Sequence, residues 1–248
     1  MHNLFGYKHI ILIILSIIVI VLGYIFSRKA KFNKLVLSIF SIGIISETIK
    51  ILYYTIQNES NYVDAAYLPK SDLPFHLCSI QIVFIAILHY SKNEKIKRLL
   101  MSFMLPSCLI GGIAALLIPP YTPRNGLWII SLQYFGYHCA IIVFALNLLL
   151  RKEMNWKLKD ILNCFKILGL FGFLSIYINS MLYDGVSNIN FMYTAKPPQD
   201  NLPYLNLDQG WFMYIIKYAL LAVVAILGCY SKTIIDAVKE FKSTKLAK

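Results

Sequence analysis

The 248-residue chain is 58% hydrophobic and only 15% charged, with a mean hydropathy of +0.63. Soluble domains carry roughly 45–50% apolar and about 25% charged residues, so this composition excludes a water-soluble globular protein. It also excludes an intrinsically disordered chain. The formal net charge of +12 would suggest nucleic-acid binding in a soluble protein, but here the cations first have to be placed relative to a membrane.

Seven apolar segments are long enough to cross a bilayer, which takes about 17–25 mostly apolar residues. In chain order they are residues 9–26, 35–56, 73–90, 99–118, 127–150, 167–183 and 211–230. We therefore expect an all-α polytopic membrane protein with seven transmembrane helices. Residues 1–230 would form a single membrane domain, and residues 231–248 a basic tail.

The distribution of Lys and Arg predicts how these helices cross the membrane. Most of the 24 cations follow the first, third, fifth and seventh segments, in clusters at residues 28–34, 92–98, 151–166 and 232–248. The positive-inside rule places such clusters in the cytoplasm. We expect the amino terminus outside, the carboxyl terminus and tail in the cytoplasm, and the chain in the cell membrane. Because the charge follows this topology, no nucleic-acid partner is expected.

The sequence carries no metal or nucleotide motif. Its five cysteines are scattered through the apolar segments, which is not the pattern of a disulfide framework. No CxxC, HExxH, GxxxxGK or GxGxxG string occurs. We therefore predict neither a metal site nor a cofactor.

Ionisable side chains inside predicted spans are costly and usually face a bundle interior or a cavity. Glu47 and Lys50 lie three residues apart in the second span, on one helical face. Lys217 lies in the last span and is a candidate partner of Glu47 or of a lipid phosphate. Two alternatives remain open for the lysines, because they either extend to the membrane surface or take part in a buried polar site.

The third span begins with the string SDLPFHLCS at residues 71–79. Asp72 as N-cap and Pro74 in the first turn make a good helix start, which puts Cys78 near the helix N-terminus. That position favours a thiolate, whereas apolar burial disfavours it. On a regular helix His76 points away from Cys78, so we do not expect it to be the base for this thiol.

A better partner for the thiol comes from the fifth span, which carries a polar stripe of Gln133, Tyr134, Tyr137 and His138. A thiol and an imidazole from another helix are the minimal arrangement for a covalent acyl intermediate. Counting residues along straight helices puts His138 about 6 Å deeper than Cys78, a gap that helix tilt has to close. The sixth span offers candidate orienting groups or oxyanion donors in Tyr177, Asn179 and Ser180.

At the string LPFHLCS, residues 73–79, the sequence resembles the YwaF-like integral membrane protein family, which includes an animal phospholipid acyltransferase. Glu47 and Lys50, a histidine in the fifth span, and the strings at residues 190–193 and 196–197 are also similar. The resemblance implies that Cys78 accepts the acyl group and that a histidine supports it. It also implies that His76 binds the lipid headgroup or holds the site.

These observations favour a cysteine-dependent acyltransferase, or transacylase, in which Cys78 forms a thioester from a phospholipid and His138 acts as base. Membrane phospholipids would be its partners. If water resolves the thioester, the same site is a lipid hydrolase. A second class is a small-molecule transporter with a polar pathway of Glu47, Lys50, His76, Gln133, His138, Asn179 and Lys217. A transporter should tolerate Cys78→Ala and fail with Glu47→Gln.

Two segments outside the spans have predicted roles. Residues 184–209 form a loop that either covers the site entrance or is disordered. The tail carries apolar residues at helical spacing between lysines, which is typical of a helix lying on the inner membrane surface.

Overall fold

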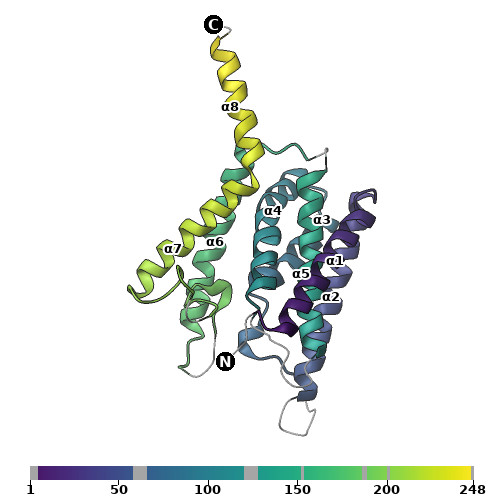
Figure 1. Ribbon diagram of the computed structural model, residues 1–248, viewed down its shortest axis with the longest axis vertical. Coiled ribbons are helices and arrows are strands. Elements are labelled where there is room, and N and C mark those ends of the chain that lie inside the picture. The colour runs from purple at the N-terminus through teal and green to yellow at the C-terminus, as the bar shows by residue number, and fades with distance from the viewer. Residues whose placement is uncertain are drawn as a thin grey trace.

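The computed structural model describes residues 5–57, 66–119, 128–151, 154–185, 189–199 and 202–246. Throughout these ranges the regular structure is helical and contains no strand, which confirms the all-α prediction. The helices are α1 (Tyr7–Ser27), α2 (Phe32–Gln57), α3 (Leu77–Tyr90), α4 (Glu94–Leu117), α5 (Trp128–Leu150), α6 (Leu158–Met181), α7 (Gly210–Cys229) and α8 (Ser231–Leu246). Two short 3₁₀ turns, η1 (Lys70–Asp72) and η2 (Phe191–Tyr193), lie between them (Figure 1).

Six of the described helices are long and apolar enough to cross a membrane, namely α1, α2, α4, α5, α6 and α7. Each overlaps one predicted span, but α6 begins nine residues before the predicted residue 167. Residue 127, the predicted start of the fifth span, lies outside the described residues. The remaining predicted span corresponds to α3, which has only 14 residues. A helix of that length is about 21 Å long, shorter than the roughly 30 Å hydrocarbon core.

The start of α3 differs from the sequence prediction. The helix begins at Leu77 and not at residue 73, and its N-cap is His76 (φ −70°, ψ 151°) and not Asp72. Residues 70–76 instead form η1 and a bend. Side chains stabilise this non-helical backbone, because Lys50 Nζ donates to the Asp72 carbonyl (3.4 Å) and His76 Nε2 to the Ser71 carbonyl (2.8 Å). Irregular backbone at membrane depth is tolerated where protein or a cavity satisfies it.

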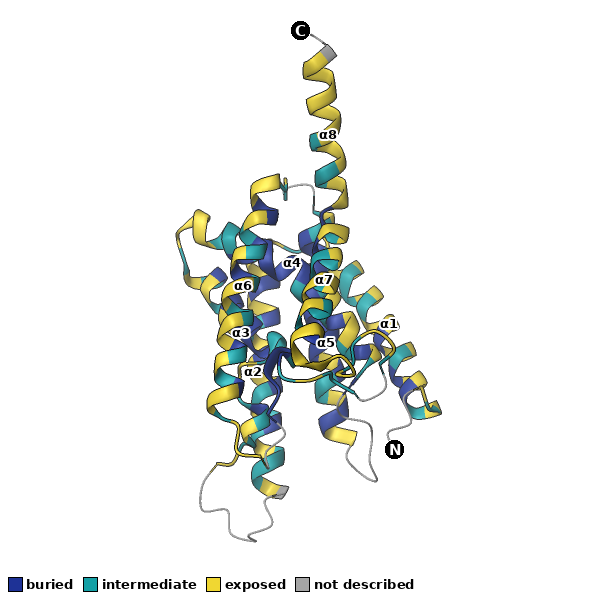
Figure 2. Cartoon of the chain, turned by 90° about the vertical axis from the view of Figure 1, so that its left-hand side faces the viewer, coloured by how far each residue is buried: buried dark blue, intermediate teal, exposed yellow. Residues whose placement is uncertain are grey.

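The bundle is built around α5, which packs against α1, α2 and α4. In the most apolar stretch of α5, 67% of the residues are buried, compared with 11% in the corresponding stretches of α1 and α7. Figure 2 shows the same gradient, with buried residues in the interior of the bundle and exposed ones on its outer helices. The α4–α5 contact needs Gly112, since a Cβ there would lie 2.6 Å from Ile142 Cγ1. The outer helices therefore present apolar side chains to the surroundings, as expected in a bilayer.

An ion pair between the buried Asp160 carboxylate and the partly exposed Arg98 guanidinium joins α4 to the first turn of α6. Arg98 donates from Nε and Nη2 to the two carboxylate oxygens of Asp160, at 2.9 and 2.6 Å. The same carboxylate accepts the backbone N–H of Lys157 (2.7 Å) and so caps α6. This two-pronged geometry is the strong form of an Arg–carboxylate contact.

The predicted helix in the tail is confirmed as α8, which continues from α7 beyond the bundle (Figure 1). Tyr230 separates the two helices, and its hydroxyl donates to the Ser102 carbonyl of α4 at 2.7 Å. Ile235, Val238 and Phe241 of α8 are exposed. Its contact with the membrane surface stays a prediction.

Candidate active site

A cavity of about 280 Å³ lies among α2, α3, α4, α5, α7 and the segment that joins α6 to α7. One group of lining residues is polar and consists of Glu47, Lys50, Asp72, His76, Cys78, Ser79, Ser107, Gln133, Tyr134, Tyr137, His138, Tyr193 and Tyr218. Of the twelve side chains proposed for a site from the sequence, eight therefore line one space. The four exceptions are Tyr177, Asn179, Ser180 and Lys217.

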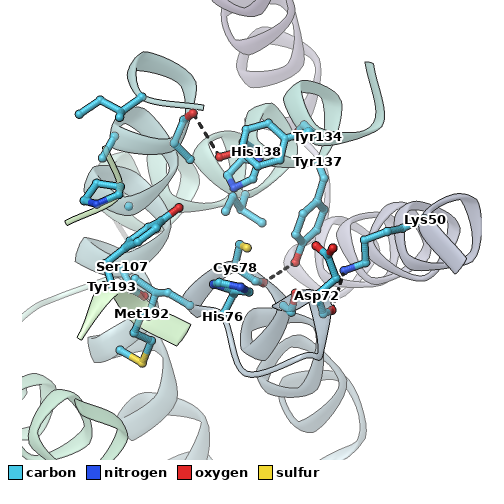
Figure 3. Close-up of a pocket in the computed structure, with 18 of the residues that line it drawn as sticks. Lys50, Asp72, His76, Cys78, Ser107, Tyr134, Tyr137, His138, Met192 and Tyr193 are labelled. Carbon is cyan, nitrogen blue, oxygen red and sulfur yellow. Dashed lines mark hydrogen bonds between the residues drawn. The ribbon is translucent and has the colours of Figure 1, made fainter. Parts of the chain in front are cut away.

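Cys78 is the second residue of α3 and points into this cavity, between the rings of His138 and His76 (Figure 3). It lies in the first helical turn, because the earliest helical bond of α3 runs from Ile80 N to the His76 carbonyl (3.0 Å). Tyr137 of α5 donates its hydroxyl to the Cys78 carbonyl at 2.9 Å. The backbone of Cys78 is thus fixed at a helix N-terminus.

The imidazole of His138 is held in one tautomer. Its Nδ1 lies 2.7 Å from the Tyr134 carbonyl one turn earlier. A carbonyl oxygen only accepts, so Nδ1 carries the proton and Nε2 keeps its lone pair. The Tyr134 ring packs against the imidazole with 4.2 Å between centroids, and its hydroxyl donates to the Ala115 carbonyl (3.2 Å). Nε2 is therefore the ring nitrogen of His138 that can accept a proton.

Cys78 and His138 line the same cavity, although the sequence count separated their depths by about 6 Å. That count treated residues 72–78 as one continuous helix. Since α3 begins only at Leu77, the count from Asp72 does not apply.

His76 also lines the cavity, so the prediction that it points away from Cys78 is wrong. The prediction assumed helical geometry, whereas His76 has an extended backbone and precedes the helix. Its Nε2 donates to the Ser71 carbonyl, and its ring packs edge-on against Phe191 at 5.1 Å. The other ring nitrogen, Nδ1, is then the unprotonated one.

Glu47 and Lys50 form the charged side of the cavity. Lys50 Nζ lies 2.8 Å from Glu47 Oε2, and the lysine is only 7% exposed. The Ser79 hydroxyl donates to Glu47 Oε1 at 3.5 Å. Of the two alternatives for Lys50, the buried polar site is the one observed. Lys217 is not the partner of Glu47, because its Nζ lies over the Tyr204 ring, 6.0 Å from the centroid.

The polar residues of α5 and α6 have different roles from one another. Gln133 lines the cavity and donates to the Ser46 hydroxyl. Asn179 lies outside it and holds the segment after α6. Its Nδ2 donates to the Phe191 carbonyl (3.0 Å) and to the Thr194 hydroxyl (2.9 Å), while Oδ1 accepts from Phe191 N (2.8 Å). With its side chain so engaged, Asn179 is not an oxyanion donor.

The other two groups proposed from the sixth span also lie elsewhere. Tyr177 is 57% exposed, and the exposed hydroxyl of Ser180 donates to the Ile176 carbonyl of its own helix. Neither residue lines the cavity.

The segment around η2 belongs to the loop at residues 184–209, for which a cover of the site entrance is one of the two sequence-based alternatives. Met192 and Tyr193 both have positive φ angles (51° and 53°) and line the cavity. Trp211 donates to the Thr194 carbonyl (2.8 Å) and Tyr214 to the Tyr193 carbonyl, which fixes this backbone. Burial raises the pKa of Tyr193, so its phenol stays neutral and able to donate. The described part of the 184–209 loop is thus an ordered cover of the cavity.

The described residues contain no cluster of three or more His, Cys, Asp or Glu side chains placed to hold a metal ion. The model of the TMEM164 family matches residues 4–230. The chain belongs to this family. The match includes Cys78, His76 and His138 together with every helix that lines the cavity. It confirms the relationship indicated by the LPFHLCS string. No curated protein and no solved structure matches the sequence significantly.

Proposed function

We propose that this member of the TMEM164 family is a membrane-embedded, cysteine-dependent acyltransferase that acts on phospholipids. One observation carries the proposal. Cys78 and His138 reach the same cavity from two helices, and the hydrogen bond at His138 Nδ1 leaves Nε2 as the proton acceptor. A thiol beside an oriented imidazole is the arrangement that nucleophilic acyl transfer needs.

In the first half-reaction His138 Nε2 takes the proton from Cys78 Sγ, and the thiolate attacks the carbonyl carbon of a phospholipid ester. The S–C bond forms, the ester C–O bond breaks, and the imidazolium returns its proton to the departing lysophospholipid oxygen. In the second half-reaction His138 takes the proton of an acceptor hydroxyl. That oxygen attacks the thioester, the C–S bond breaks, and Cys78 regains its proton.

The first turn of α3 would stabilise the charge that develops on the carbonyl oxygen. The N–H groups at the start of a helix have no helical acceptor, and the helix dipole is positive there. The N–H groups of Leu77, Cys78 and Ser79 occupy that position. Backbone donors aimed at a developing oxyanion are typically the largest single contribution to acyl-transfer catalysis.

Topology bears on the acyl donor. We infer seven crossings, with residues 66–76 and α3 together making the third, and an outer amino terminus as the distribution of Lys and Arg indicates. The cavity then lies toward the outer half of the bilayer. Cytosolic acyl-CoA is an awkward donor for such a site, so a phospholipid donor fits better and makes the enzyme a transacylase.

The test is an assay of the full chain in vesicles that contain a phospholipid with a labelled acyl chain and an unlabelled lysophospholipid. The proposal predicts labelled acceptor for the wild type and none for Cys78→Ala. Cys229→Ala is the matched control, because Cys229 is another half-buried free cysteine, at the end of α7, and should keep full activity. Labelled free fatty acid in place of labelled acceptor would make the protein a hydrolase. Full activity in Cys78→Ala would contradict both reactions.

A further inference from the structure

A second group of residues that line the cavity is apolar. It consists of small and aliphatic residues of α4, the segment before α7, and α7 itself, namely Gly111, Ala114, Ala115, Leu202, Leu205 and Leu221. Figure 3 shows Lys50 and Asp72 on one side of Cys78 and Met192 and Tyr193 on the other. The thiol therefore lies between the charged side of the cavity and the side formed by Met192 and Tyr193, as an ester carbonyl lies between a headgroup and an acyl chain.

The exposed residues that line the cavity lie on two helices. Among the described residues that line it, Ala114 and Leu221 are exposed, and the others are buried or half-buried. Ala114 belongs to α4 and Leu221, which is 47% exposed, to α7. Both helices are apolar enough to span a membrane. Figure 1 shows that the N-terminal end of α7 lies farther from α4 than its C-terminal end does. The mouth thus faces the lipid.

A path leads from this mouth to the nucleophile along one face of α4. Ser107, Gly111, Ala114 and Ile118 line the cavity at helical spacing, and they cover about 16 Å of helix at 1.5 Å per residue. The path passes beside the nucleophile. A Cβ on Gly111 would lie 3.2 Å from Cδ2 of Leu77, the residue that precedes Cys78.

We propose that the acyl chain of the lipid ester enters between α4 and α7, past Ala114 and Leu221, and that the small side chain of Ala114 determines which chains are accepted. This inference rests on the proposed acyl transfer and adds to it an acyl-chain subsite with a lateral entrance. An apolar pocket discriminates between ligands mainly by the volume that it leaves free.

The experiment measures the rate of acyl-adduct formation on Cys78 by intact mass, using vesicles of dioleoyl phosphatidylcholine and, separately, micelles of dihexanoyl phosphatidylcholine. Ala114→Trp should lower the rate with the dioleoyl lipid about tenfold or more and change the rate with the dihexanoyl lipid about twofold or less. The matched control is Ile113→Trp, since Ile113 is the neighbouring residue of α4, is exposed and does not line the cavity. It should change neither rate.

A second pair of variants covers the other side of the mouth. Leu221→Trp should repeat the loss seen with Ala114→Trp, and Leu220→Trp, also exposed but not lining the cavity, should not. If the wild type forms the adduct, and Ala114→Trp and Ile113→Trp form it equally fast, this inference alone is overturned. The inference would also be overturned if Ala114→Trp and Leu221→Trp lowered the rate of adduct formation equally with both lipids while iodoacetamide alkylated Cys78 at the normal rate. Absence of any wild-type adduct would overturn the proposed function together with the subsite.

Discussion

The segment that covers the cavity depends on one side chain of α6, and Asn179→Leu tests that dependence. Leucine keeps the volume but removes three hydrogen bonds to Phe191 and Thr194. The Phe191 carbonyl retains a bond from the Thr194 hydroxyl (3.2 Å), whereas the buried Phe191 N–H loses its acceptor. An orphaned buried donor costs about 1–3 kcal/mol and each other lost bond about 0.5–1.5 kcal/mol. The free energy of unfolding should therefore fall by about 2–6 kcal/mol.

Two measurements on purified Asn179→Leu check this estimate. The midpoint of thermal unfolding should drop by several degrees, and a water-soluble maleimide should alkylate Cys78 faster, because Met192 and Tyr193 no longer cover it. The matched control is Ser180→Ala, since the Ser180 hydroxyl bonds only within its own helix. Wild-type midpoint and alkylation rate in Asn179→Leu would refute the role of Asn179 as the anchor of this segment.

Two further substitutions test contacts away from η2. Tyr137→Phe removes the donor to the Cys78 carbonyl. Because Cys78 is then less well positioned, adduct formation should slow about tenfold, as measured by intact mass over time. An unchanged rate would contradict a positioning role for Tyr137. Arg98→Met leaves the buried Asp160 carboxylate unpaired and should cost about 3 kcal/mol of stability in denaturant unfolding. Lys97→Met, which breaks only a surface pair, should cost less than about 1 kcal/mol. Equal losses in the last two would contradict the assigned burial.

The long helices could be predicted from the sequence because about 20 consecutive apolar residues have few alternatives in a bilayer. The start of α3 could not. Asp72 followed by Pro74 is a sound local signal for a helix start, yet the helix begins at Leu77. The carbonyls of Ser71 and Asp72 are stabilised instead by His76 and by Lys50 of another helix. A contact across 22 residues leaves no trace in local propensity.

The site was predictable where one helix fixes the geometry and not where several elements meet. Glu47 and Lys50 pair at i,i+3 as helical spacing indicates. Tyr137 and His138 face the cavity together. In contrast, the roles of Asn179 and Lys217 depend on the segment between α6 and α7, which packs through contacts that the sequence pattern does not encode. The positive φ angles of Met192 and Tyr193 are likewise a product of tertiary contacts, since neither residue favours them locally.

The covalent intermediate is the central claim, and intact mass of the full chain after incubation with phospholipid vesicles tests it most directly. The account predicts one added acyl group that hydroxylamine removes, located on Cys78 by peptide mapping. The adduct should be absent in Cys78→Ala and should form more slowly in His138→Ala. An acyl group on another cysteine, or lipid turnover without any adduct while Cys78→Ala stays active, would contradict the account.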